Sequence, residues 1–407
     1  MMEKEQHIPK SELDSFSRLL PLPYRVAVIL VAGFWGWGIN LHYLYKAKID
    51  VPALIRYPPR QSPSQKPHHT SAYHLATLLT IPLVISILLF WTVTRGDGEL
   101  VKYWQVIPQS YYWIFGILLL WPFHRLSRSG RYRFIMALKR ISIGGLAEAQ
   151  DGKFGDILLA DALTSYAKVI ADLWVSLCMY WKGRGTPSTG RPDRTCGGEA
   201  LIPIIIGIPS LIRLRQCLIE YVRVRRAGYR GDGWGGQHLA NALKYASAFP
   251  VIALTALQRN YNPLNFGGMS EMQLYRLWIF FSFINSFYSF YWDVAKDWDL
   301  SLFSAARSDP EHPFGLRRHR GFRSDNLYYG AIIIDFILRF TWVCKISHRY
   351  DHITELESSI FVLMFLEVAR RWMWVFFRVE TEWVRNNRGP APDDILLGEF
   401  TGKKDQD

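Results

Sequence analysis

The sequence predicts an all-α, polytopic membrane protein with about nine transmembrane helices. Hydrophobic residues make up 49% of the 407 positions, and they gather in blocks close to the ~20 residues that cross a ~30 Å hydrocarbon layer. Helices of soluble proteins would show narrower apolar stripes. Trp and Tyr often lie near the ends of these blocks, as in "FWGWGINLHYLY", where amphipathic rings favour the headgroup zone.

The apolar blocks place the predicted spans in order along the chain. We expect them at residues 21–42, 74–95, 107–125, 155–181, 200–222, 238–258, 272–299, 325–348 and 356–379. The first block is too long for the apolar core of a signal peptide and has no evident cleavage site, so we expect it to remain as a helix. The fourth and sixth spans are the least hydrophobic.

Basic residues predict the orientation of these spans. With nine spans, Lys and Arg concentrate in the first, third, fifth and seventh loops, and short basic loops are strongly biased to the cytoplasmic side. This segregation predicts a lumenal or extracellular N-terminus and a cytosolic C-terminus. The third loop mixes its basic residues with apolar ones, so it can lie along the anionic cytosolic leaflet. A solvated basic linker explains that composition equally well.

Cysteine spacing and charge exclude several other classes. Cys178, Cys196, Cys217 and Cys344 show neither a paired nor a metal-ligand spacing, which predicts no disulfide framework and no zinc site. Topology and leaflet attraction account for most of the net charge of +13. No nucleic-acid motif accompanies that charge, so we expect no nucleic-acid partner.

Ionisable residues inside the predicted spans are the most informative feature. A charge at the bilayer centre costs at least ~2.5 kcal/mol, so such residues usually pair or face a wet cavity. The charged and neighbouring polar positions are Asp156, Asp161, Thr164, Ser165, Lys168, Asp172, Lys244, Tyr245, Asp293, Asp297, Asp335, Arg339, Glu367, Arg370 and Arg371. Together they predict a polar pathway through spans four to nine.

Each acid and base pair also has a structural explanation. Asp335 and Arg339 are four residues apart, and Glu367 precedes Arg370 and Arg371 by three and four. Such pairs can neutralise themselves within one helix, and residues near span ends can extend to the interface. Neutralisation alone does not require four cations on three helices, namely Lys244, Arg339, Arg370 and Arg371. Guanidinium and ammonium groups in a cluster favour an oxyanion such as phosphate.

An enzyme is a weaker interpretation of the sequence. No nucleophile and base pair or metal cluster is visible, so we predict no catalytic residue, no metal and no cofactor. The glycine-rich stretch at residues 228–237 follows no predicted strand, and we expect a flexible loop there rather than a phosphate-binding one.

Six sequence blocks, in this order, resemble the EXS-domain family, which includes phosphate exporters of the xenotropic and polytropic retrovirus receptor type. The blocks are "FGDILLADALTS", "IPSLIRLRQCLIEYVRVRR", "HLANALKYASAF", "YSFYWDVAKDWDL", "LYYGAIIIDFILRFTW" and "LEVARRWMWVFFRVE". The resemblance covers nearly all of the membrane region. It implies a homodimer in which the last six helices of each copy form a transport core around a phosphate path.

The resemblance also implies roles for residues and segments. The path would be lined by Asp161, Lys244, Arg339, Arg370 and Arg371. Supporting or gating positions would be Thr164, Ser165, Tyr245, Asp293, Asp297, Trp342 and Glu367. The chain would comprise a short N-terminal segment (1–20), a transmembrane scaffold (21–153), the EXS transport domain (154–385) and a flexible cytosolic tail (386–407). About twenty residues precede the first span, so we expect no inositol-polyphosphate-sensing SPX module.

The short architecture is similar to that of the ER-retention-defective members of this family, which are Golgi membrane proteins. It implies a multi-pass Golgi protein that moves inorganic phosphate from the lumen to the cytosol. That activity would support glycosylation and the retention of ER and Golgi residents. The alternative is a non-transporting membrane protein that retains or recycles Golgi glycosyltransferases and lumenal ER proteins, with the buried charges only holding its helices together.

Overall fold

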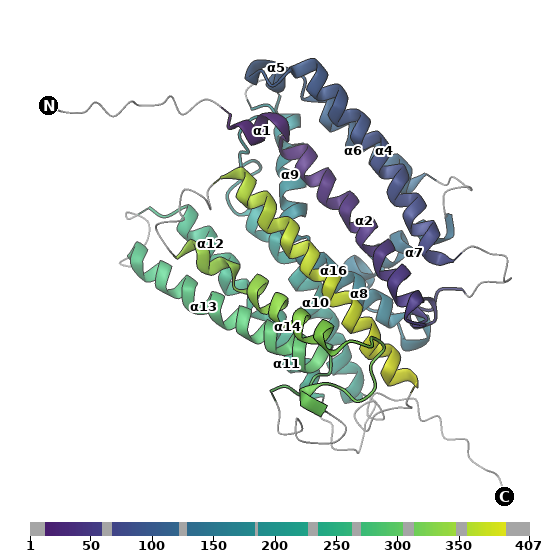
Figure 1. Ribbon diagram of the computed structural model, residues 1–407. Helices are drawn as coiled ribbons and strands as arrows, with labels where there is room; N and C mark the ends of the chain where they lie inside the picture. Colours follow the sequence, from purple (N-terminus) through teal and green to yellow (C-terminus); the bar gives the residue numbers. More distant parts are fainter. Residues whose placement is uncertain are drawn as a thin grey trace, which may run out of the picture.

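The computed structural model describes residues 13–58, 67–121, 128–183, 186–226, 235–262, 270–303, 313–346 and 356–387. Within these ranges the regular elements are all helical, which confirms the all-α prediction (Figure 1). Residues 388–407 of the predicted tail 386–407 and most of the glycine-rich stretch 228–237 lie outside the described residues, whereas residues 386 and 387 still belong to the last helix.

The helices of the N-terminal half are α1 (Ser15–Leu19), α2 (Leu22–Lys46), α3 (Val51–Leu54), α4 (His68–Thr94), α5 (Gly98–Tyr103), α6 (Val106–Leu120), α7 (Arg128–Lys139), η1 (Arg140–Gly144), η2 (Ala149–Asp151), α8 (Lys153–Ser165) and α9 (Ala167–Lys182). Those of the C-terminal half are α10 (Leu201–Arg226), α11 (Gly236–Ala246), α12 (Ala248–Arg259), α13 (Glu271–Trp292), η3 (Asp293–Asp297), η5 (Pro313–Gly315), α14 (Asp325–Arg339), η6 (Thr341–Lys345) and α16 (Glu357–Asn387).

Two groups of helices meet on α16. Helix α2 packs against α4, α6, α9 and α16, and Figure 1 shows α2, α4 and α6 running side by side. Helix α16 also contacts α8, α14 and η3. The 31-residue α16 therefore joins the N-terminal helices to the elements that carry most of the buried charges.

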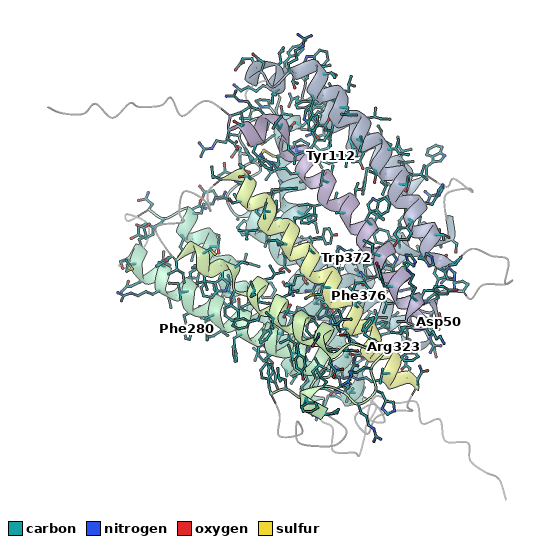
Figure 2. The ribbon with its side chains drawn as sticks, viewed as in Figure 1. Asp50, Tyr112, Phe280, Arg323, Trp372 and Phe376 are labelled. Carbon is teal, nitrogen blue, oxygen red and sulfur yellow. A yellow bond between two sulfur atoms is a disulfide. The ribbon has the colours of Figure 1, made fainter. Side chains whose placement is uncertain are left out.

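Small residues allow α2 and α16 to pack closely. A Cβ atom at Gly36 would lie 2.7 Å from the Trp372 indole. The rings of Trp37 and Trp372 are 6.5 Å apart, and those of Tyr43 and Phe376 are 6.4 Å apart. Trp372 and Phe376 lie between the two helices in Figure 2. Small residues at a contact let membrane helices approach each other, which explains a glycine in the middle of a predicted span.

Other helix faces are apolar and exposed. On α13, Phe280, Phe283 and Phe287 are each more than half exposed, and Figure 2 shows Phe280 at the outer edge of the helices. Large contiguous apolar surfaces mark protein or membrane contacts. Together with the long apolar helices, these faces identify a multi-pass membrane protein.

The number of spans remains a prediction. Four helical stretches in the described ranges are long and apolar enough to cross a membrane, namely Leu22–Lys46, His68–Thr94, Leu201–Arg226 and Gly236–Arg259. A fifth is obtained if α8 and α9, which bend by 63°, form one span. Every predicted span overlaps a helix, but α6 and α14 have only 15 residues each, which is about 22 Å of helix.

Helix interruptions are common in the C-terminal half. The chain bends by 63° between α8 and α9 at Tyr166, whereas the turn residue Ser247 separates α11 from α12 within one helical stretch, Gly236–Arg259. Helix α13 continues into the π-helix η3, and α14 ends at Arg339 before the 3₁₀-helix η6. Backbone breaks at membrane depth occur where they are buried in protein or line a water-filled cavity.

The prediction of no disulfide was wrong for one pair of cysteines. Cys178 near the end of α9 is bonded to Cys196 in the segment before α10. The 18-residue separation hides the pair in the sequence, because only the fold returns this segment to α9, where Cys196 packs with Met179 and Ile202. Disulfides form in oxidising compartments, which agrees with the predicted lumenal position of this loop.

Candidate functional site

Charged residues and one tyrosine from six helical elements form one continuous central cluster, and most of them are buried. We define it as Asp161, Arg213, Lys244, Tyr245, Asp293, Asp297, Asp335, Arg339, Glu367, Arg370 and Arg371, which come from α8, α10, α11, η3, α14 and α16. All five predicted phosphate-path residues belong to this cluster.

Asp293 is the carboxylate at the centre of this cluster. It is fully buried, and its Oδ1 accepts a bond of 2.9 Å from the ammonium of Lys244. Its Oδ2 pairs with Arg339 and lies 3.5 Å from Nη1 of Arg370. One carboxylate is therefore shared by three cations from three helices, so none of the three has Asp293 to itself.

Arg370 is held by acids on two helices. It makes two bonds to Glu367 on its own helix, of 2.9 and 2.6 Å, and its Nη1 donates to Asp335 on α14 at 2.8 Å. The self-neutralising pair expected between Asp335 and Arg339 reaches only 3.9 Å. Neutralisation within one helix thus explains part of the bonding of Arg370 but not that of Arg339.

Arg371 differs from the other cations of the cluster. It is buried, and its partners are the hydroxyls of Ser165 at 2.9 Å and Thr164 at 3.0 Å. Its guanidinium lies 4.7 Å from the Trp374 ring centroid, and Nη1 has no hydrogen-bond partner. Within the described ranges no carboxylate lies at ion-pair distance from it, so the expected pairing with Glu367 does not occur. A buried guanidinium without an anion is costly.

Asp161 is bound by a cation that the sequence analysis missed. Nε of Arg213, on α10, donates to Asp161 at 2.8 Å and to the hydroxyl of Tyr245 at 3.2 Å. Tyr245 in turn donates to Asp161. The signal was present, because Arg213 interrupts the apolar block "LIPIIIGIPSLIRL" as Lys244 interrupts its own. The carboxylate of Asp161 is therefore already bound by Arg213 and Tyr245, at one side of the cluster.

The remaining predicted residues lie at the edges. Asp297 is 3.2 Å from Lys244 and 4.0 Å from Arg378. Trp342 donates to Ser286 at 2.9 Å, away from the cations. Asp156 pairs with Arg140 outside the cluster.

The interruptions of the helices coincide with the central cluster. Thr164 and Ser165 precede the bend at Tyr166, and Lys244 and Tyr245 precede the turn residue Ser247. Asp293 and Asp297 begin and end the π-helix η3. Glu367, Arg370 and Arg371 belong to the uninterrupted helix α16, and Arg213 belongs to the uninterrupted helix α10. Discontinuous helices that carry ionisable groups are typical of transporter binding sites.

A second group of charges lies nearer the predicted lumenal end. We call it the lumenal network and define it as Arg25, Lys168, Asp172, Arg194 and Glu357. Glu357 accepts a bond of 2.6 Å from Arg25 and two bonds, of 2.9 and 3.0 Å, from Arg194. Lys168 pairs with Asp172 on its own helix, and Arg194 lies 3.8 Å from the same acid.

The central cluster can hold a small anion by chemistry alone. It joins five cations from four helical elements, two of its arginines have nitrogen atoms without hydrogen-bond partners, and hydroxyls surround Arg371. Arginine binds phosphate through two parallel hydrogen bonds, and lysine adds a movable point charge.

Comparison with known proteins assigns the chain to a family. The family model described as "EXS family" matches residues 20–384. The chain belongs to the EXS family. The match covers both the predicted scaffold and the predicted transport core.

Several known proteins are similar to this chain. The chain is 32% identical to protein ERD1 homolog 1 of Schizosaccharomyces pombe over 91% of its own length and 93% of that protein. It is 30% identical to protein ERD1 of Kluyveromyces lactis, over 94% and 99%. It is 28% identical to solute carrier family 53 member 1 of Mus musculus, where the similarity covers 89% of this chain and 50% of the longer protein.

Proposed function

We propose that this EXS protein is a Golgi membrane transporter that moves inorganic phosphate from the lumen to the cytosol. Phosphate would enter the central cluster, take hydrogen bonds from Arg339, Arg370 and Arg371, and release the carboxylates that hold these cations. The chemistry needs no covalent step and no cofactor. The family and the similarity to a solute carrier support transport, and the similarity to ERD1 proteins supports the Golgi location.

The observation that carries the proposal is Arg371. Its guanidinium is buried with hydroxyl partners and one free nitrogen, where a protein that needed only to neutralise its charges would supply a carboxylate. Hydroxyls leave the positive charge available, and the surrounding acids limit how tightly an anion is held. A transported ion must be bound well enough to leave water and loosely enough to depart.

The direct test is phosphate flux into vesicles that contain the purified protein. Arg371→Gln should lower flux at least about tenfold, because one hydrogen bond to a charged group is worth ~1.5–3 kcal/mol. Arg371→Lys should restore part of it. Arg194→Gln is the matched control, since it removes a half-buried arginine from the lumenal network and should leave the flux of the folded protein near that of the wild type. Undiminished flux in Arg371→Gln would refute the proposal.

The rival function is retention or recycling of Golgi glycosyltransferases without transport. It predicts no flux in wild-type vesicles and a normal location of a glycosyltransferase in cells that express Arg371→Gln. Our proposal predicts phosphate flux in the wild-type vesicles. A homodimer and contacts with membrane lipids belong to the proposal as well, and cross-linking in membranes tests the dimer.

A further inference from the structure

Three arginines follow one face of α16 from the central cluster toward its C-terminal end. Arg371, Arg378 and Arg385 are seven residues apart, which is about 10 Å of helix per step and nearly two full turns. Their side chains become steadily more accessible, from a buried Arg371 to 13% exposure at Arg378 and 30% at Arg385. We call these three residues the arginine ladder.

Each lower rung of the ladder faces an aspartate at the end of the π-helix or just after it. Arg378 lies 4.0 Å from Asp297, and Arg385 lies 3.6 Å from Asp299. Both separations are long for an ion pair, whereas the bond from Arg378 to Glu382 on its own helix is 2.9 Å. The two aspartates therefore hold their arginines more loosely than Asp293 holds Lys244.

The ladder is continuous with the central cluster through Asp297. This carboxylate contacts Lys244 on one side and approaches Arg378 on the other. The guanidinium of Arg378 also lies 5.0 Å from the Phe154 ring centroid at the start of α8, so a helix of the central cluster flanks it. The sequence pattern predicts only the end of a span in this part of α16 and no role for Arg378 or Arg385.

We propose that Arg378 and Arg385 form a relay of oxyanion sites that leads phosphate from the central cluster to the cytosol. The inference rests on the proposed function. An anion that leaves Arg371 would meet a guanidinium about 10 Å away along the helix, and then a second one that is open to solvent. After the anion has passed, Asp297 and Asp299 again pair weakly with Arg378 and Arg385.

Vesicle flux with matched variants tests the relay. Arg378→Gln should reduce maximal flux at least fivefold while the lumenal phosphate concentration for half-maximal flux changes less than twofold, because the relay acts after entry. Arg378→Lys should recover most of the flux. Arg385→Gln should reduce maximal flux about twofold to threefold, since water already reaches that rung. Arg225→Gln, an exposed arginine at the end of α10, controls for the loss of one positive charge.

A second variant separates a relay from a purely structural ion pair. Glu382→Gln breaks the tightest bond of Arg378 but keeps its positive charge, so flux should be at least as high as in the wild type. Equal losses of flux and of melting temperature in Arg378→Gln and Glu382→Gln would overturn the relay. Normal flux in Arg378→Gln would overturn it too and leave the proposed function standing. Absence of flux in the wild type would overturn both.

Discussion

The central cluster and the lumenal network use similar residues in different ways. In the lumenal network, Glu357 binds two arginines, and Arg25 is also fixed by the carbonyl of Leu20 and the hydroxyl of Ser17. The Cys178–Cys196 bond holds the segment that carries Arg194. In the central cluster, three cations share Asp293 and Arg371 has hydroxyl partners only. The first arrangement fixes helices in place, whereas the second leaves cations that an anion can bind.

The largest effect on stability is expected in the lumenal network. Glu357→Gln leaves the buried Arg25 without its acid, and removing one partner of a buried ion pair costs ~3–5 kcal/mol. The melting temperature of the purified protein should fall clearly, while phosphate flux per folded molecule is retained. Glu99→Gln, which breaks the exposed pair with Lys102, should change the melting temperature little. A loss of flux at unchanged stability in Glu357→Gln would end the distinction between the two regions.

The disulfide should contribute slightly less to stability than the ion pairs of Glu357. Replacing Cys178 and Cys196 by serine removes a cross-link with a sequence separation of 18, worth about 3 kcal/mol in a chain-entropy estimate. Thermal unfolding with and without reductant measures this contribution. Cys344→Ser, at an exposed free cysteine, is the control. An equal melting temperature for the double variant and the control would show that the other contacts of the segment, such as those of Ser188 and Thr189, hold it without the cross-link.

In the central cluster a substitution should change transport as well as stability. Asp293→Asn leaves three cations without their common carboxylate, so phosphate should bind more tightly and leave more slowly. We expect maximal flux to fall about tenfold, which corresponds to ~1.4 kcal/mol, and half-saturation to occur at a lower phosphate concentration. Asp325→Asn removes an exposed partner of Arg320 and serves as the control. Weaker phosphate binding in Asp293→Asn would contradict an anion site.

The smallest effect is expected from one hydroxyl. Thr164→Val removes an acceptor of Arg371, and the phosphate concentration for half-maximal flux should change by roughly threefold, in line with ~1 kcal/mol for a single hydrogen bond. Thr80→Val on α4 is matched, because Thr80 also accepts a side-chain bond and donates to a backbone carbonyl of its helix. Identical flux curves for both variants would remove Thr164 from the site.

The sequence predicted the helices and most residues of the central cluster because both depend on local patterns. An apolar block indicates a helix. A charged residue inside such a block indicates that a partner group lies next to it, and this pattern predicted Lys244, Arg339 and Arg370. Pairing depends on contacts between helices, so the sharing of Asp293 was not predictable. Arg213 was missed although it carries the same signal. Cys178 and Cys196 meet only because a loop folds back, and no spacing rule describes that.

Because η3 is a π-helix, the number of residues between α13 and the following loop should matter for function. A π turn holds one residue more than an α turn, so Asp293 and Asp297 reach their partners with that extra residue in place. Deleting Val294 or Ala295 would convert the π turn to an α turn and place Asp297 three residues after Asp293 instead of four. The spacing of the two acids around Lys244 would then change although no charge had been removed. Related sequences should thus tolerate substitutions in this turn far more readily than insertions or deletions.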